Sequence, residues 1–274
     1  MSPTLASASN GYLYLQVPGN LQQKGAQIES FRSDYWYGSY RVRIKAGAHS
    51  GTTQQGSVNS FFFYNTATGQ EIDVEILTNE HESKTVHFVT HPGNYEKICS
   101  LPADPTKTFI EYGFDWYKTT VKYYVNGVKC DEETRAVPSA KGTIILNHRT
   151  GNTGWGGNPP PVVSTMSVDY VWHAPFVLVI NPDSSGIVWT KGTSRTILWN
   201  RYGDVASSPV TIELWKGGVF YQTIHAHASN TGTYTWVVPS LLPVASNYRI
   251  KIKSTLSKDY YDFSNNDFSI KALR

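Results

Sequence analysis

Several features that mark other classes of protein are scarce or missing in this chain of 274 residues. Charged residues make up 16% of it, the net charge is +3, and no Lys/Arg run is dense enough to bind nucleic acid. No apolar segment approaches the ~20 residues that a membrane-spanning helix needs. Helical periodicity is nearly absent. We therefore expect no nucleic-acid partner, no membrane span and no helical fold.

Cysteine is also scarce, with two residues in the whole chain. Cys99 and Cys130 lie in separate strand-like segments and have no CxxC or metal-like spacing. They form either one disulfide or two buried thiols, and the sequence leaves both interpretations open. No hydrophobic leader is visible at the N-terminus, so we interpret Met1-Ser2-Pro3 as a start added to a mature or trimmed chain.

Short β-rich runs alternate with Gly, Asn, Pro and Ser turns along the chain. Asn126-Gly127, between Val125 and Val128, is a strong hairpin signal. This pattern predicts an antiparallel β-sandwich. The runs that predict strands in the first part cover residues 12–17, 38–44, 58–64, 85–90, 109–115 and 120–125.

The composition of the sequence and the length of its β-rich runs change near residues 173–175. After this point the runs are shorter, Thr and Ser are more frequent, and Trp recurs. The number of runs is typical of an immunoglobulin-like domain. They cover residues 187–190, 196–199, 210–215, 220–225, 232–237 and 248–254. We therefore expect an all-β protein with one domain at residues 1–175 and a smaller one at residues 176–274.

Residues 71–76 alternate acidic and apolar side chains, in the order Glu-Ile-Asp-Val-Glu-Ile. A strand has a period of two, so Glu71, Asp73 and Glu75 point one way while the apolar side chains point towards a core. Like charges on one face repel each other, and acidic residues are depleted in strands. A functional role therefore explains the three acids better than a solvated polar face does.

The spacing of the outer two acids favours one chemistry. Residues i and i+4 of a strand are about 13 Å apart at Cα. Two Glu side chains that lean inward close this gap to about 5–6 Å, near the carboxyl separation of retaining glycosidases. An Asp side chain at either outer position would be too short to close this gap. The order Glu71, Asp73, Glu75 therefore predicts one acid that attacks, one that donates a proton and one between them.

The segment 70–75 resembles the catalytic signature of glycoside hydrolase family 16. That family contains lichenases, laminarinases, xyloglucan transglycosylases and agarases, so the resemblance implies a concanavalin-like β-jelly roll. The segments 37–45, 58–64, 114–116 and 123–127 resemble the strands around the signature, and the resemblance covers roughly residues 10 to 173. The signature lacks the extra residue of laminarinase-like members, which favours the lichenase and xyloglucan-active branch.

The resemblance implies a role for each acid. Glu71 matches the nucleophile, which forms a glycosyl-enzyme. Glu75 matches the general acid/base, which has to be protonated when substrate arrives, and neighbouring carboxylates favour that form. Asp73 matches the middle acid, which hydrogen-bonds the nucleophile and tunes its charge.

The resemblance also implies a set of substrate-binding residues. Gln27 and Glu29 match a strand whose polar side chains hold a sugar on the non-reducing side. His91 falls where lichenases place a Tyr that faces the substrate, although a lone His is also commonly structural. Lichenases carry an additional N-terminal stretch that is nearly missing here, so we expect a cleft that is more open on one side.

A glycine-rich loop at residues 151–157 completes the expected cleft. Asn147 and Trp155 match a hydrogen-bonding Asn and a stacking Trp of the family. Arg149 departs from the family, because lichenases commonly carry a Trp at this position. A guanidinium can still stack on a sugar or donate hydrogen bonds to it.

No cofactor is required for this chemistry, but the resemblance implies a candidate structural Ca²⁺ site. Asp169 matches a family Ca²⁺ ligand on the convex face, with the Gly11 carbonyl as its partner. The N-terminal partner is not evident. A calcium ligand and a plain strand end are therefore both open interpretations of Asp169.

Residues 176–274 resemble an immunoglobulin-like, Ser/Thr-rich surface domain related to fungal cell-wall glucan assembly proteins. The segments that carry this resemblance are 197–199, 210–218, 232–236 and 248–252. Exposed aromatic side chains could make the domain an accessory polysaccharide-binding module. The alternative is a spacer or stabilising domain, and no catalytic constellation is evident in its sequence.

We therefore expect a monomeric, retaining endo-β-glucanase that is extracellular, either secreted or associated with a cell wall. Its substrate would be β-1,3-1,4-glucan or β-1,3-glucan. Two alternatives use the same residues: a transglycosylase, and a hydrolase of another β-linked polysaccharide such as xyloglucan. A non-catalytic glucan-binding lectin would share the sandwich, but a pure binder has no need of three mutually repulsive acids.

Overall fold

The computed structural model describes residues 3–22, 24–48, 52, 54–152 and 154–273. Met1 and Ser2 of the interpreted start, and Thr153 of the glycine-rich loop, lie outside the described residues. The chain divides into two compact units. The first comprises Met1–Trp36 and Tyr40–His173, and the second comprises Tyr37–Ser39 and Ala174–Arg274. The limits expected from the sequence, 1–175 and 176–274, do not assign the segment 37–39 to the second unit.

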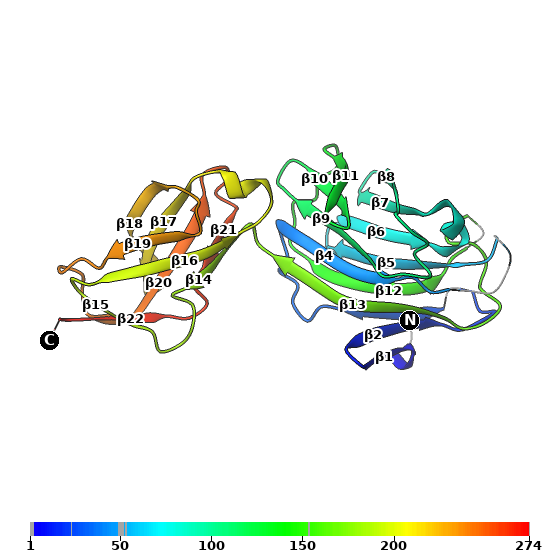
Figure 1. Ribbon diagram of the computed structural model, residues 1–274, viewed down its shortest axis with the longest axis horizontal. Helices are drawn as coiled ribbons and strands as arrows, with labels where there is room; N and C mark the ends of the chain where they lie inside the picture. Colours follow the sequence, from blue (N-terminus) through cyan, green and yellow to red (C-terminus); the bar gives the residue numbers. More distant parts are fainter. Residues whose placement is uncertain (1–2, 23, 49–51, 53, 153, 274) are drawn as a thin grey trace. The chain divides into compact units, whose positions relative to one another are not determined.

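The first unit is a sandwich of two β-sheets (Figure 1). The seven-stranded sheet has the order β1 (Ala6–Ser9), β2 (Tyr12–Val17), β13 (Ser164–Ala174), β4 (Gly38–Lys45), β9 (Ile110–Trp116), β10 (Val121–Val125) and β11 (Val128–Glu133). The six-stranded sheet has the order β3 (Gly25–Glu29), β12 (Thr143–Thr150), β5 (Ser57–Tyr64), β6 (Glu71–Leu77), β7 (Thr85–His91) and β8 (Tyr95–Ser100).

The core of this sandwich is built from alternate residues of the strands. Ile72, Val74 and Ile76 of β6 are fully buried, which confirms the face expected from the 71–76 pattern. Between the sheets, the ring centroid of Phe63 on β5 lies 4.4 Å from that of Trp116 on β9. The burial of one face fixes the register of each strand, and it thereby fixes which side chains project from the other face.

The predicted hairpin at Asn126-Gly127 is confirmed. It joins β10 to β11, and both residues adopt positive φ values, 47° and 74°. Asn and Gly reach this left-handed region at low cost, which is why the pair favours a tight turn between strands. The edge strand β8 contains Cys99, whose segment the sequence analysis described as strand-like. Its apolar alternation is weak, because Glu96, Lys97 and Ser100 are polar.

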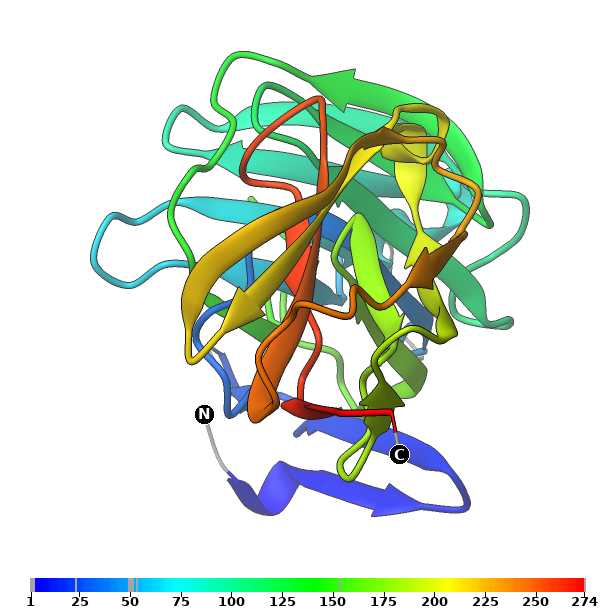
Figure 2. The same cartoon turned by 90° about the vertical axis from the view of Figure 1, so that its left-hand side faces the viewer.

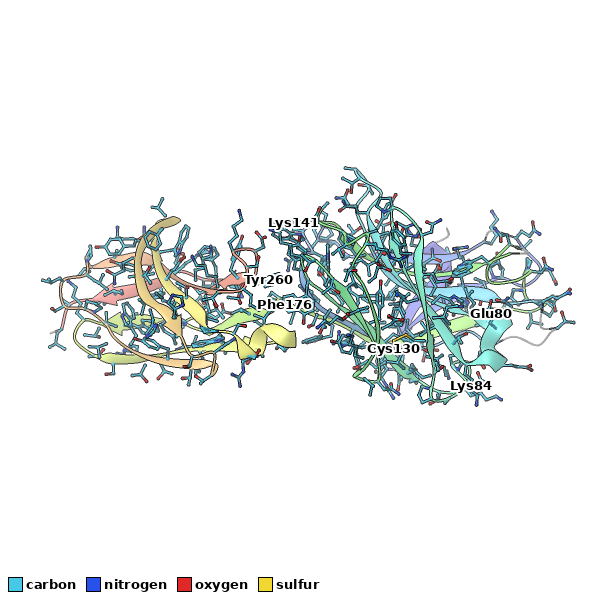
Figure 3. All side chains as sticks on the ribbon, turned by 90° about the horizontal axis from the view of Figure 1, so that it is seen from above. Glu80, Lys84, Cys130, Lys141, Phe176 and Tyr260 are labelled. Atoms are coloured by element: carbon cyan, nitrogen blue, oxygen red, sulfur yellow. A yellow bond between two sulfur atoms is a disulfide. The ribbon has the colours of Figure 1, made fainter. Side chains whose placement is uncertain are left out.

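Cys99 and Cys130 form a disulfide, which decides between the two interpretations left open by the sequence (Figure 3). Cys99 lies on β8 and Cys130 on β11. These are the last strands of the six-stranded and the seven-stranded sheet. The bond therefore joins the two layers of the sandwich at one margin.

The second unit also contains two sheets (Figures 1 and 2). One has the order β14 (Val177–Asn181), β16 (Ser194–Arg201) and β19 (Thr233–Val237). The other has the order β15 (Val188–Thr190), β22 (Phe268–Lys271), β20 (Ala245–Ser254), β17 (Val210–Lys216) and β18 (Val219–Ala228), with β21 (Tyr261–Phe263) also paired to β20. Trp189, Trp199 and Trp236 are buried in its core.

The described part of the chain contains helical turns only as three short 3₁₀ segments, η1 (Pro3–Leu5), η2 (Thr78–Ser83) and η3 (Gly203–Ser207). The described residues include no helix of the length and apolar character that a membrane crossing requires. The all-β class expected from the sequence is confirmed.

We predict that the Cys99→Ala/Cys130→Ala double variant unfolds at a lower urea concentration. The bond closes a loop with a sequence separation of 31 residues. Its loss should lower the free energy of unfolding of the first unit by about 3–4 kcal/mol, because the unfolded chain regains conformational freedom. Tryptophan fluorescence in urea measures this, with the reduced native chain as a matched control. An unchanged midpoint would contradict the prediction.

Candidate active site

The three acids of β6 project from the face of the six-stranded sheet that lies opposite the core. β6 lies between β5 and β7. In its register with β7, Glu71 pairs with His91 and Glu75 with His87, with Asp73 between them. Directly paired residues project from the same side of a sheet, so the two histidines accompany the acids. The histidines face a continuous acidic strip on the neighbouring strand.

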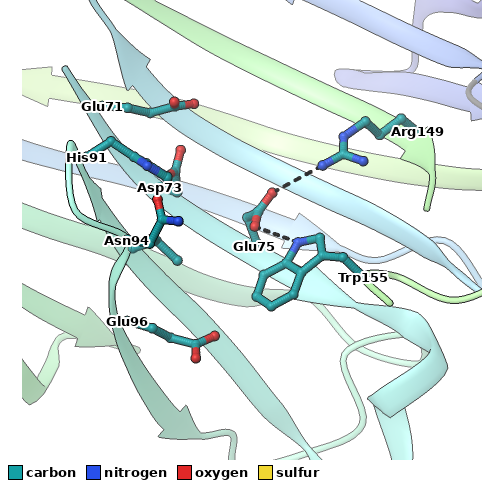
Figure 4. Close-up of a pocket in the computed structure, with 9 residues that line it drawn as sticks. Glu71, Asp73, Glu75, His91, Asn94, Glu96, Arg149 and Trp155 are labelled. Carbon is teal, nitrogen blue, oxygen red and sulfur yellow. Dashed lines mark hydrogen bonds and ion pairs between the residues drawn. The ribbon is translucent and has the colours of Figure 1, made fainter. Parts of the chain in front are cut away.

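A pocket of about 440 Å³ lies over this strip (Figure 4). Its lining includes six residues that the sequence singled out: Glu71, Asp73, Glu75, His91, Arg149 and Trp155. Val89, Asn94 and Glu96 complete the lining and were not predicted. The structure therefore brings together side chains from β6, β7, β8 and β12, from the β7–β8 turn and from the glycine-rich loop.

Glu71, Asp73 and His91 form a tight cluster at one end of the pocket. One oxygen or nitrogen from each of them lies within 4.8 Å of the others. Nε2 of His91 is 3.2 Å from Oδ2 of Asp73. The Glu71 and Asp73 carboxyl groups are joined by a side-chain hydrogen bond. Asp73 is thus held from both sides, by its neighbour on the same strand and by the paired strand.

The environment of this pair favours a bound proton. Burial, followed by the neighbouring charge of Asp73, raises the pKa of Glu71 to about 8. Burial, followed by the charge of Glu75, raises the pKa of Asp73 well above its usual range. Two close carboxyls titrate as a pair, and near neutral pH this pair retains a proton in the hydrogen bond between them.

Glu75 is oriented by contacts to both carboxylate oxygens. The indole Nε1 of Trp155 donates a hydrogen bond of 2.8 Å to Oε2 (Figure 4). Oγ of Ser60 donates one of 3.3 Å to Oε1, and the guanidinium of Arg149 lies 3.8 Å from the same oxygen. The predicted stacking residue Trp155 is therefore also a hydrogen-bond donor to the predicted acid/base. Ser60 was not predicted, although it pairs with Glu75 across β5 and β6.

The loop that carries Trp155 is shaped by its own polar groups and glycines. Oδ1 of Asn152 accepts hydrogen bonds from the backbone N–H groups of Gly154 and Trp155, at 3.1 and 3.0 Å. Gly156 has a φ of +76°, and a Cβ there would lie 2.4 Å from a methyl carbon of Val58. A larger residue would push the loop away from β5, so glycine allows the indole to reach Glu75.

His87 is a further residue of this site that the sequence analysis missed. Its ring lies edge-on to Trp155, with 5.1 Å between centroids. Its two nitrogens contact Oε1 of Glu96 at 2.6 Å and Oε2 of Glu80 at 3.1 Å. A signal was available, because a period of two counted back from His91 places His87 on the same face of the strand.

Gln27, Glu29 and Asn147 lie beside the pocket and not in its lining. Nδ2 of Asn147 donates to Oε1 of Gln27, and Nε2 of Gln27 donates to Oε1 of Glu29, each at 2.8 Å. Asn147 pairs with Ser60 in the register of β12 and β5, which places the row on the same sheet face as Glu75. These residues form a hydrogen-bonded polar strip on the two strands at the far edge of the sheet.

Asp169 lies on β13, where its carboxylate accepts a hydrogen bond from Arg43. Gly11 and Asp169 both line a separate pocket of about 540 Å³. Among the residues that the structure describes, the charged group bound to Asp169 is a guanidinium, so a cation would have to displace Arg43 from it. The residues present fit an ion pair better than a calcium site, and Ca²⁺ binding stays a prediction.

Comparison with known proteins gives two family matches. A family model described as "Glycosyl hydrolases family 16" matches residues 3–150. A model described as "Kre9/KNH-like N-terminal Ig-like domain" matches residues 182–270. Both matches agree with the resemblances that the sequence analysis stated. The first lies in the first unit apart from segment 37–39, and the second lies within the second unit.

Two of the similar sequences are bacterial proteins described as β-glucanases. The "Beta-glucanase" of Bacillus amyloliquefaciens is 34% identical over 131 residues, which are 45% of this chain and 53% of that protein. The "Beta-glucanase" of Paenibacillus polymyxa is 33% identical over 153 residues, which are 53% of this chain and 62% of that protein. The chain thus spans about half of the length of the first of these relatives.

Similar solved structures share the sandwich. The Bacillus licheniformis β-glucanase superposes with a TM-score of 0.56 at 27% identity, over 63% of this chain and 83% of that one. A Crh5 transglycosylase in complex with NAG superposes with a TM-score of 0.51 at 19% identity, over 61% of this chain and 74% of that one. At that identity the second similarity shows the fold alone.

We predict that Asp73→Asn lowers the pKa of Glu71 from about 8 by roughly one unit or more. The substitution removes the neighbouring negative charge, while burial keeps the pKa above its ordinary value. A ¹³C NMR titration of the Glu71 carboxyl measures the change. Asp183→Asn, which removes the same charge in the second unit, is the matched control, and a Glu71 titration that is identical in both variants would contradict the prediction.

Proposed function

Because the chain belongs to glycosyl hydrolase family 16, we propose that it is a retaining endo-β-glucanase that cuts internal bonds of β-1,3-1,4- or β-1,3-glucan. The observation that carries the proposal is the row of Glu71, Asp73 and Glu75 along one pocket. The description of its relatives as β-glucanases supports the substrate class. Retention is supported by the spacing of the two Glu residues at i and i+4 of one strand, which side chains that lean inward are expected to close to about 5–6 Å.

In the first step, the Glu71 carboxylate attacks the anomeric carbon while Glu75 gives its proton to the leaving sugar oxygen. The bond to the leaving oxygen breaks and a covalent glycosyl-enzyme forms. Glu71 has to be ionised for this attack. Asp73 can accept the shared proton through their hydrogen bond and donate it back to Glu71 as a neutral acid. Burial, which raises the pKa of Asp73, makes it a suitable holder of that proton.

In the second step, water replaces the sugar that has left. Glu75, now a carboxylate, removes a proton from this water, and the oxygen attacks the anomeric carbon. The bond to Glu71 breaks, so the product regains the original anomeric configuration. Trp155 and Ser60 hold the two oxygens of Glu75, and this keeps the carboxyl group in one place for both proton transfers.

Several groups around the acids suit a polyhydroxylated chain. The polar row of Gln27, Glu29 and Asn147 offers amide and carboxylate groups to sugar hydroxyls on one side of the acids. Arg149 offers guanidinium donors, and the Trp155 ring offers an apolar surface. These residues therefore serve as candidate subsites along the same sheet face.

We further propose that the protein acts outside the cell, either secreted or associated with a cell wall. The Cys99–Cys130 disulfide is typical of an oxidising compartment. The match to a Kre9/KNH-like domain supports the same location. A polysaccharide substrate of this kind is also met outside the cell.

Reducing-sugar release from barley mixed-linkage glucan, laminarin, xyloglucan and agarose tests the proposal. We expect release from one or both of the first two polymers. Glu71→Gln should reduce kcat by about a thousandfold or more, because the amide cannot form the covalent intermediate. It should leave glucan binding in place, since the side chain keeps its size.

Product analysis separates the remaining alternatives. NMR of the first products should show the β anomer, and an initial α anomer would rule out retention. An added acceptor sugar should leave hydrolysis dominant, whereas transfer products in excess of hydrolysis would replace the hydrolase with a transglycosylase. Binding of glucan with no turnover of any of the four polymers would indicate a lectin.

We predict that Trp155→Phe keeps the ring but reduces kcat/KM by about tenfold, because it removes one hydrogen bond to a charged group. The loss should appear in kcat as well as in kcat/KM, because the indole N–H holds Oε2 of Glu75 in place for both proton transfers. Trp189→Phe, in the core of the second unit, is the matched control. A Trp155→Phe variant with the kcat/KM of the native chain would contradict the role of the indole N–H.

A further inference from the structure

One Trp of the second unit lies apart from its buried core. Trp215 on β17 is half-buried, and it pairs with Phe220 on β18 and with Arg249 on β20. Figures 1 and 2 show these three strands side by side. Phe263 of β21 packs edge-on against the Trp215 ring, with 5.0 Å between centroids. Trp215 therefore belongs to an aromatic group on the outer side of the sheet.

A pocket of about 310 Å³ opens beside this group. Its lining consists of Trp215, Gly217, Gly218, Arg249, Phe263 and Asp267. Small-molecule sites generally start at about 300 Å³ and combine an apolar wall with a few polar groups. Gly217 and Gly218 have φ values of +59° and +79° and form the β17–β18 turn, so no side chain fills the space at that end.

The polar groups of the pocket suit an uncharged ligand rich in hydroxyls. Nε of Arg249 lies 2.6 Å from Oδ1 of Asp267, and both side chains are about half exposed, at 43% and 47%. The pair cancels its own charge, which disfavours a strongly anionic ligand. The guanidinium keeps further N–H donors and the carboxylate a further oxygen, and a planar donor–acceptor pair of this kind can bind adjacent sugar hydroxyls.

The aromatic walls are held in place before any ligand binds. The ammonium of Lys251 lies 5.2 Å from the Trp215 ring, 4.0 Å from Tyr261 and 5.0 Å from Phe263. The indole Nε1 of Trp215 donates a hydrogen bond of 2.9 Å to Glu213. These contacts limit the rotamers of the rings, so binding costs less side-chain entropy than it would with mobile aromatics.

We propose that this pocket is a second carbohydrate site, which binds a sugar ring of a neutral β-glucan chain away from the catalytic pocket. The Trp215 and Phe263 rings contact the apolar face of the sugar, and Arg249 and Asp267 bind its hydroxyls. The choice of β-glucan as ligand rests on the function proposed above. The two units belong to one chain, so glucan bound at this pocket raises the effective concentration of polymer for the acids of β6.

Affinity electrophoresis of the full chain tests the site. Native gels contain barley mixed-linkage glucan or laminarin, and every variant carries Glu71→Gln so that the polymer stays intact. The Trp215→Ala variant should bind at least about threefold more weakly than its parent in one of the two gels. The reason is that the chain then holds the polymer at the catalytic pocket alone and not at two linked sites. Tyr221→Ala, an exposed aromatic of the same hairpin outside the pocket lining, should migrate like the parent.

A second variant guards against loss of folding in Trp215→Ala. Arg249→Ala/Asp267→Ala removes a surface ion pair that contributes little to stability, and it should weaken retardation in the same gel. Retardation should also survive about 0.5 M NaCl, which screens interactions between exposed charges. Equal migration of parent and pocket variants in both gels, or retardation that disappears in salt, would overturn the proposal.

The gel experiment tests the second site separately from the proposed endoglucanase activity, because the gels measure binding and not hydrolysis. Trp215-dependent retardation in a chain that releases no reducing sugar would leave this site standing and remove the proposed endoglucanase. Hydrolysis by the native chain, together with identical migration of parent and pocket variants, would do the reverse.

Discussion

The two-residue period of β6 is the constraint on which the candidate site depends. The apolar side chains of the strand fill the core, and this forces Glu71, Asp73 and Glu75 out on the opposite face. Their repulsion cannot be relieved by a shift of register, because a one-residue slip would move the acids into the core. Burial of the two acids, followed by the charges of their neighbours, raises the pKa values of Glu71 and Asp73, so the packing of the sandwich sets the protonation of the pocket.

Neighbouring strands divide the acids into two environments. Glu71 and Asp73 are buried side by side and share a hydrogen bond, which favours storage of a proton at that end. Glu75 instead accepts hydrogen bonds from Trp155 and Ser60. Carboxyls of one strand are thereby placed in unlike surroundings, which is the usual means of giving like groups different roles in acid–base chemistry.

The sequence was sufficient where local pattern determines the outcome. Alternation predicted both faces of β6, and Asn126-Gly127 predicted its hairpin turn. The sequence could not predict contacts between residues that are distant along the chain. The indole N–H of Trp155 reaches Glu75 only because a glycine-rich loop lies against β5. The pairing of Cys99 with Cys130 likewise depends on two edge strands that meet in space.

The Cys99–Cys130 bond also bears on association between copies of this chain. β8 and β11 end their sheets, and an end strand presents unpaired backbone groups that can recruit a strand from another molecule. Both end strands also carry charge, with Glu96 and Lys97 on β8 and Lys129, Asp131 and Glu132 on β11, and Nζ of Lys97 lies 3.5 Å from Oδ1 of Asp131. The disulfide across the margin keeps β8 and β11 together. Separation of the two strands would expose more unpaired backbone, to which a strand of another molecule could pair. The bond and these charges therefore act together as protection against aggregation at this margin.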